Sequence, residues 1–517
     1  MRTRKSIINL ATGLAGQALA LLSSFILRVF FARSMPASYL GLSGLFTNIL
    51  SMLLLVELGV GPAITFSLYK PLAGHDTETV RKLMRLFQMA YRGIGCAILA
   101  LGFLFTPVYP HLIQDPGGIE ELDLIYWLYV VNTGISYFYS YKVSLIIADQ
   151  NQYIKNIGHY VAYVLMNVAQ TVILVTTHNY VLFLVCQIAF TVSENLILSR
   201  VADRMYPFLR EKNAGRLPRE QTAPIVRNIR AMLCHNVGNI VVNSTDNILI
   251  SKFMGLAVSG VYSNYALILT AVRNILTRAF DAVQASVGNL YAVGDEEKLR
   301  EVFDRLCFMA FLLYGACAIC VGCLIQPCVR LAFGEAYQLD GLTVLMLVLS
   351  FYLTGMRAPL SVMRAAGGLY YKDWAKPIAE SAVNLVASIL FLRWFGTAGI
   401  FMGTITSTLL ACAWVEVWIV YRNMLHTGVG LYIRRYLKYL LSTGAVGLLV
   451  HAAVSALSGT GVLRFALQAV VCLALVMTLF SLLYWRNRHF VYFRNLVFTL
   501  FREGTRFLTK AIHRNEP

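Results

Sequence analysis

Charged residues are scarce in this chain, and acidic residues are the scarcer kind. Only 14% of the 517 residues are charged, whereas 58% are hydrophobic and the mean hydropathy is +0.63. Soluble domains carry about 25% charged residues. This composition therefore excludes one or two water-soluble globular domains and indicates a protein of the lipid bilayer.

The 26 acidic residues are outnumbered by 44 basic ones, which gives a formal net charge of +18. In a soluble protein this excess would suggest nucleic acid as a partner. Here the basic residues concentrate in every second gap between apolar runs, which is the pattern of cytoplasmic loops. We therefore expect both termini on the cytoplasmic side and no nucleic-acid partner.

Apolar windows of about 20 residues are long enough to cross a bilayer as helices. They predict an all-α integral membrane protein with about fourteen spans. The predicted spans start near Ile8, Leu40, Leu83, Leu122, Ile154, Tyr180, Ile229, Val258, Arg305, Asp340, Pro377, Gly396, Leu431 and Val462.

A polar interruption bearing Pro and Gly, from about Asp203 to Thr222, divides the chain into two lobes of six spans. The segments Arg33–Gly41 and Lys252–Gly260 resemble each other, and each joins the first to the second helix of its lobe. We predict an N-lobe (1–202), a cytoplasmic linker (203–227), a C-lobe (228–424), a terminal helix pair (425–485) and a basic amphipathic cytoplasmic tail (486–517).

The chain lacks a nucleotide-binding P-loop of the GxxxxGK[ST] type, so we expect no ATP hydrolysis and no cofactor. Its ten cysteines lie mostly within the apolar runs. Cys317, Cys320 and Cys323 resemble part of an iron–sulfur motif, but the fourth ligand and the Pro of that motif are missing. We interpret them as helix-packing residues and expect no metal.

Arginines occur where lipid should exclude them. Arg28, Arg273, Arg278 and Arg357 lie inside long apolar runs. A charge at mid-bilayer costs roughly 2.5–3.5 kcal/mol on insertion scales, so such residues face water or a partner and mark a substrate path. A forked guanidinium suits phosphate oxygens. The pattern predicts a cationic cavity and an anionic substrate.

Helical spacing aligns these arginines with other polar residues. The predicted stripes are Gln17, Ser24 and Arg28; Asn239, Asn243 and Asp246; Thr270, Arg273, Thr277, Asp281 and Gln284; and Ser350, Thr354, Arg357, Ser361 and Arg364. Such stripes either line a cavity or hold helices together by hydrogen bonds. As substrate-binding candidates we name the four arginines with Gln17, Asn239 and Asn243.

Several acidic residues also lie deep in the predicted spans. Glu57, Asp246 and Asp281 are candidates for ion coupling, and Asp281 has the spacing to pair with Arg278. Glu380 and Glu416 fall nearer the cytoplasmic ends, where we expect a solvated position. Glu57 opens the segment Glu57–Pro62, which we expect to interrupt the second span because proline removes a backbone donor.

Three segments resemble polysaccharide flippases of the Wzx type, in the multidrug/oligosaccharidyl-lipid/polysaccharide (MOP) exporter superfamily. They are Tyr39–Ala73, Thr245–Tyr265 and Ser286–Leu290. The resemblance implies V-shaped lobes and flipping of undecaprenyl-diphosphate-linked oligosaccharide across a bacterial plasma membrane, for capsule or exopolysaccharide assembly. It also implies membrane lipids, a polysaccharide polymerase and other assembly proteins as partners, and a cationic cavity containing Arg28, Arg273 and Arg278.

Two alternatives remain open. A multidrug exporter of the same superfamily would carry cations and use carboxylates in its cavity. A membrane glycan polymerase or ligase would need a sizeable outer loop with catalytic residues. The longest outer gap, about Val108 to Leu122, holds little beyond His111 and Asp115, so we expect a transporter and not an enzyme.

Overall fold

The computed structural model is helical throughout, and no strand occurs in the part of the chain that it describes. It describes residues 2–54, 57, 60–114, 118–119, 121–210, 215, 218, 245–369, 375–457, 461–495 and 499. The predicted all-α class is confirmed.

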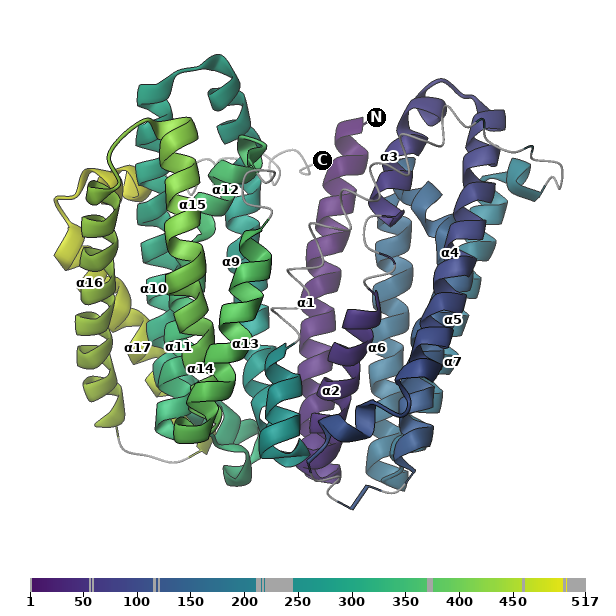
Figure 1. Ribbon diagram of the computed structural model, residues 1–517, viewed down its shortest axis with the longest axis horizontal. Helices are drawn as coiled ribbons and strands as arrows, with labels where there is room; N and C mark the ends of the chain where they lie inside the picture. The colour runs from purple at the N-terminus through teal and green to yellow at the C-terminus, as the bar shows by residue number, and fades with distance from the viewer. Residues whose placement is uncertain are drawn as a thin grey trace, which may run out of the picture. The chain divides into compact units, whose positions relative to one another are not determined.

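Contacts divide the chain into two compact units, Met1–Asn264 and Tyr265–Pro517. In the first unit, long helices lie side by side (Figure 1). They are α1 (Arg2–Ser34), α2 (Ala37–Leu53), α3 (Val60–Ala73), α4 (Thr77–Phe105), α5 (Leu122–Ala148), α6 (Gln152–Thr177), α7 (Tyr180–Met205), a helix over 245–254, and the beginning of α9 (Leu256–Val293).

The second unit continues α9 and adds a further set of helices. They are α10 (Glu296–Phe333), α11 (Gly341–Gly355), α12 (Ala358–Ala366), α13 (Lys376–Phe395), α14 (Thr397–Ser407), α15 (Ala413–Val420), α16 (Gly430–Ser455) and α17 (Gly461–Tyr484). Two π-helical segments, η6 (Thr408–Cys412) and η7 (Tyr421–Leu425), flank α15. The division by contacts falls inside α9, and the lobe boundaries expected from the sequence stay predictions.

Ten helices of the described residues are long and apolar enough to cross a membrane. Helices also begin at or near the predicted starts Leu122 and Val258, as α5 and α9, whereas the predicted seventh span lies mostly outside the described residues. Large apolar side chains stay exposed along α16 and α17, as a lipid-facing surface requires. The protein spans the membrane several times, and the number fourteen remains a prediction.

Two of the predicted spans are broken helices. The predicted interruption after Glu57 is confirmed, because α2 ends at Leu53 and α3 begins at Val60. A second break separates α11, which ends at Gly355, from α12. Pro359 lies in the first turn of α12, where a missing N–H is tolerated. The sequence analysis did not anticipate this second break.

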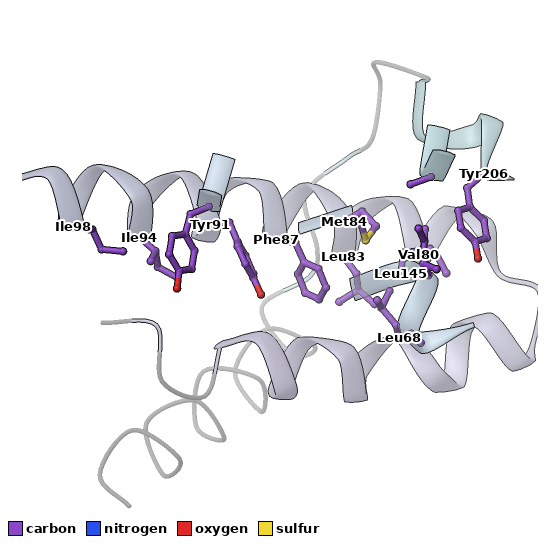
Figure 2. Close-up of a cluster of buried hydrophobic side chains, with 14 residues drawn as sticks. Leu68, Val80, Leu83, Met84, Phe87, Tyr91, Ile94, Ile98, Leu145 and Tyr206 are labelled. Atoms are coloured by element: carbon purple, nitrogen blue, oxygen red, sulfur yellow. The ribbon is translucent and has the colours of Figure 1, made fainter. Parts of the chain in front are cut away.

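The core of the first unit lies along one face of α4. Buried residues recur every three or four positions, from Val80 through Phe87 to Ile98, which places them on one side of the helix. Figure 2 shows these side chains projecting from α4, with Leu68 of α3 and Leu145 of α5 in the same cluster. This core fixes α3 just after the break in the second span.

The two repeated segments are helix joints, as predicted, and they contact each other within the first unit. A Cβ atom added to Gly41 of α2 would lie 1.8 Å from the carbonyl oxygen of Leu256. A Cβ atom added to Gly260 of α9 would lie 1.9 Å from the carbonyl oxygen of Ala37. The contact is reciprocal and joins backbone to backbone, so only glycine fits at either position.

In the second unit, α16 and α17 pack against α10 through aromatic rings. The ring centroids of Phe311 and Tyr439 are 4.5 Å apart, and those of Phe311 and Tyr484 are 5.0 Å apart. Cys320 of α10 and Cys472 of α17 meet at 3.9 Å between sulfur atoms. These cysteines pack between helices, as expected.

Gly260→Ala should lower the free energy of unfolding by about 1–3 kcal/mol or more, because the new methyl group overlaps a backbone oxygen that cannot move away easily. Gly93→Ala in α4 is the matched control, since nothing lies within 4 Å of its added Cβ atom. Thermal unfolding in detergent measures both. Equal unfolding temperatures for the two variants would contradict the close contact.

His489 follows α17 and is buried against Phe308. Burial lowers the pKa of its imidazole, and the nearby Arg488 lowers it further. The folded state therefore binds this proton less well than the unfolded state. Stability from His489 should be present above about pH 6.5 and decline as the pH falls below it. Thermal unfolding between about pH 7.5 and pH 5.5 should reveal this loss, and His489→Gln should reduce it.

Candidate functional site

Arg28 of α1 is held by the beginning of α9. Its Nε donates to Oδ1 of Asn264 at 2.8 Å, and its Nη2 donates to the hydroxyl of Ser263. Asn264 is fully buried. One turn earlier on α1, the hydroxyl groups of Ser24 and Tyr163 lie 2.9 Å apart. The predicted Ser24–Arg28 face therefore makes specific polar contacts to two other helices.

The other candidates of the first unit lie apart from Arg28 in different surroundings. Gln17 is partly buried on α1, beside Gly16, whose added Cβ atom would lie 1.9 Å from the ring of Tyr160. Glu57 is partly buried and accepts a hydrogen bond from the hydroxyl of Tyr137.

Three of the remaining polar positions are only partly accessible to description. Asp246 is partly buried in the helix over 245–254. Asn239 and Asn243 lie outside the described residues.

Two predicted stripes come together in the second unit, around a pocket of about 240 Å³. The stripe of α9 contributes Arg273, Thr277, Asp281 and Gln284. The stripe after Asp340 contributes Thr354 of α11 and Ser361 of α12. The remaining lining residues are Phe280, Tyr314, Gly355, Ala358, Val362 and Ala365. Ligand pockets commonly measure about 300–1,000 Å³, so this one suits part of a larger ligand.

Charges of both signs border the pocket. Arg273 is partly buried on its wall, and its carbonyl oxygen accepts a hydrogen bond from Thr277 at 2.9 Å. Arg278 is 73% exposed and lies 4.0 Å from the carboxylate of Asp281, as the spacing predicted. An exposed pair of this kind is worth roughly 0–1 kcal/mol. Asp281 therefore compensates the arginines only weakly.

Arg357 has a different environment from Arg273. Its Nε and Nη2 donate to both oxygens of Glu416, at 3.0 and 2.7 Å, and its Nη1 lies 3.1 Å from Glu380. Arg364 and Lys376 reach the same Oε1 of Glu416, at 2.9 and 2.5 Å. We call these five residues the ion cluster.

The ion cluster corrects the interpretation of two acids. Glu416 is fully buried and Glu380 is only 12% exposed, so the expected solvated positions were wrong. Glu416 is 59 residues from Arg357. Because no local spacing links residues so far apart, the pairing could not be read from the sequence.

The first unit has further ion pairs that the sequence analysis missed. Lys142 of α5 contacts Asp203 of α7 at 2.7 Å. His159 of α6 contacts Glu194 of α7 at 2.9 Å. Each pair connects neighbouring helices. Across the described residues, no group of three or more His, Cys, Asp or Glu side chains is arranged to hold a metal ion.

Residues 120–342 match the family described as polysaccharide biosynthesis protein. A search of curated proteins finds no match by sequence.

Solved structures match the fold over most of the chain. The lipid II flippase MurJ, in an inward closed conformation, is 12% identical, with a TM-score of 0.67 over 93% of this chain and 99% of MurJ. An inward-facing multidrug resistance MATE transporter of the MOP superfamily is 16% identical, with a TM-score of 0.59 over 78% of this chain and 94% of that chain. The Vibrio cholerae MATE transporter VcmN is 15% identical, with a TM-score of 0.53 over 84% and 99%.

These matches confirm the resemblance stated from the sequence. The chain is related to polysaccharide biosynthesis proteins over 120–342 and has the fold of MOP superfamily transporters.

Arg28→Met should lower the free energy of unfolding by about 1–3 kcal/mol, because it leaves the buried amide of Asn264 without this donor. The double variant Arg28→Met/Asn264→Leu should recover part of the loss, which a double-mutant cycle measures. Arg92→Met is the control, since Arg92 is an exposed arginine of α4. Strictly additive effects of the two substitutions would contradict the coupling.

Proposed function

We propose that this chain, a multi-pass membrane protein with the fold of the MOP transporters, is a flippase. Its substrate would be an undecaprenyl-diphosphate-linked oligosaccharide, which it moves from the cytoplasmic to the outer leaflet of a bacterial plasma membrane. The movement follows alternating access, with the cationic headgroup site open to one side of the membrane at a time. Both termini are cytoplasmic in this proposal, and the products supply a polysaccharide polymerase and other assembly proteins.

The observation that carries the proposal is the pocket of the second unit. Arg273 shares its wall with the hydroxyl groups of Thr277, Thr354 and Ser361 and with the amide of Gln284. A guanidinium among neutral donors suits phosphate oxygens and sugar hydroxyls. A pocket of about 240 Å³ accommodates a headgroup portion while the polyprenyl chain remains in lipid. The family match over 120–342 independently connects the chain with polysaccharide.

The candidate residues take separate roles in this proposal. Arg28, Arg273 and Arg278 bind the diphosphate, with Arg357 as a further cation of the same unit as Arg273. Sugars contact the amides Gln17, Asn239 and Asn243. Glu57, Asp246 and Asp281 are the candidates for ion coupling.

Membrane potential can drive the proposed direction of transport. Moving one elementary charge across 100 mV is worth about 2.3 kcal/mol. An anionic headgroup that leaves a negative interior moves downhill. No protein-bound nucleotide is required for this step.

A cation exporter is the second candidate function. The fold match to MATE transporters includes this class, and Asp281 on the pocket wall is 54% exposed, so its carboxylate is accessible to a cation. Proteoliposomes that expel a cationic dye against its gradient, with loss of transport in Asp281→Asn, would favour it. A glycan polymerase or ligase finds no comparable support, because the fold is that of transporters.

Flipping of a labelled undecaprenyl-diphosphate oligosaccharide in proteoliposomes tests the proposal. Arg273→Ala should slow flipping roughly 10- to 100-fold, since a hydrogen bond to a charged group is worth about 1.5–3 kcal/mol. Arg393→Ala, at the exposed end of α13, is the control and should flip at the wild-type rate. An imposed potential, negative inside, should accelerate wild-type flipping.

Two results would overturn the proposal. A folded wild-type protein that flips no substrate would exclude this function. Equal flipping by wild type and Arg273→Ala would exclude the pocket as the diphosphate site.

A further inference from the structure

Glu416 is the shared acceptor of the ion cluster, and the surrounding helix is irregular. It lies on α15, between the π-helical segments η6 and η7. Segments of π-helix are rare and frequently occur at functional sites, because an extra residue per turn redirects the side chains that follow. The helix that carries Glu416 thus deviates from α-geometry on both sides of it.

The helix α12 presents different residues to the pocket and to the ion cluster. Ala358, Ser361, Val362 and Ala365 line the pocket. Arg357, at the N-cap of α12, and Arg364, in its last turn, bind Glu416. One carboxylate on α15 therefore holds α12 at both of its ends, and α12 lies against α15 (Figure 1).

These contacts are strong because they are buried. Arg357 binds Glu416 through two parallel hydrogen bonds, the geometry that adds direction to the charge attraction. The side chain of Glu416 is 0% exposed and that of Arg364 is 6% exposed. Removing one partner of such a pair leaves an uncompensated charge in a low dielectric, which is strongly destabilising. α12 therefore has one favoured position relative to α15.

We infer that Glu416 is a positioning residue for the pocket. By holding Arg357 and Arg364 it sets the place of α12, and thereby the distance between Ser361 and the Arg273 wall of α9. The identity of the pocket's ligand, a diphosphate-linked oligosaccharide, rests on the proposed function. The positioning of α12 does not depend on that identity.

Lys376 makes the inference testable, because it binds the same oxygen of Glu416 from another helix. Lys376 and Arg364 have nearly equal exposure, 7% and 6%. Only Arg364 belongs to α12, whereas Lys376 begins α13. If Glu416 positions α12, loss of Arg364 affects the pocket and loss of Lys376 does not. If the cluster only stabilises the fold, the two losses are equivalent.

The first experiment compares Arg364→Met with Lys376→Met by hydrogen–deuterium exchange of the backbone amides of α12. We expect exchange in α12 to be at least tenfold faster in Arg364→Met and unchanged in Lys376→Met, because only the first variant releases α12. Glu416→Gln should accelerate exchange as well, and Glu416→Asp, which keeps the charge, should restore part of the protection. Equal exchange in Arg364→Met and Lys376→Met would overturn the inference.

The second experiment measures the substrate dependence of flipping in the same variants. Arg364→Met should raise the half-saturating substrate concentration at least tenfold, and Lys376→Met should leave it unchanged. Asp304→Asn is a further control, since Asp304 binds Arg435 and Arg488 away from the pocket lining. An unchanged half-saturating concentration in Arg364→Met would overturn the inference, whereas absence of flipping by wild type would overturn the proposed function alone.

Discussion

Compensation of charge inside a low-dielectric bundle is the constraint on which this structure depends. A buried guanidinium is tolerated only when acceptors surround it, because the protein interior cannot replace the water that it loses. Arg28 meets this condition with the side chains of Asn264 and Ser263, whereas Arg357 uses the carboxylates of Glu416 and Glu380. Neutral acceptors leave the charge of Arg28 in place, but carboxylates offset that of Arg357.

Breaks in the helices determine where these charges are used. α11 and α12 are separated beside Arg357, so a single stripe of the sequence supplies both the pocket wall and the ion cluster. The break after Glu57 similarly ends α2 and leaves a carboxylate beside Tyr137. Close glycine contacts have the opposite effect, because Gly41 and Gly260 bring two backbones together. Irregular backbone thus occurs where polar groups need direction, and the tightest packing where helices must not separate.

The fold and the chemistry of the pocket bear on different parts of the functional question. Transporters that share this fold include MurJ, a lipid II flippase, and MATE exporters, so the fold alone does not select a substrate. Selection must come from side chains such as Arg273 and Asp281, which line the same pocket with opposite charges. The weak compensation of Arg273 and Arg278 by the exposed Asp281 is the reason to favour an anion.

The sequence by itself determined the all-α membrane class, most helix positions, the break after Glu57 and the two stripes around the pocket. These features follow from local rules of hydrophobic length, helical period and proline chemistry, which act within a few turns. Only the tertiary structure decided that Ser361 faces the pocket while Arg364 binds Glu416, and that Glu416 is buried. The partners of a buried charge come from distant helices, and their distance depends on how those helices pack, which no local spacing records.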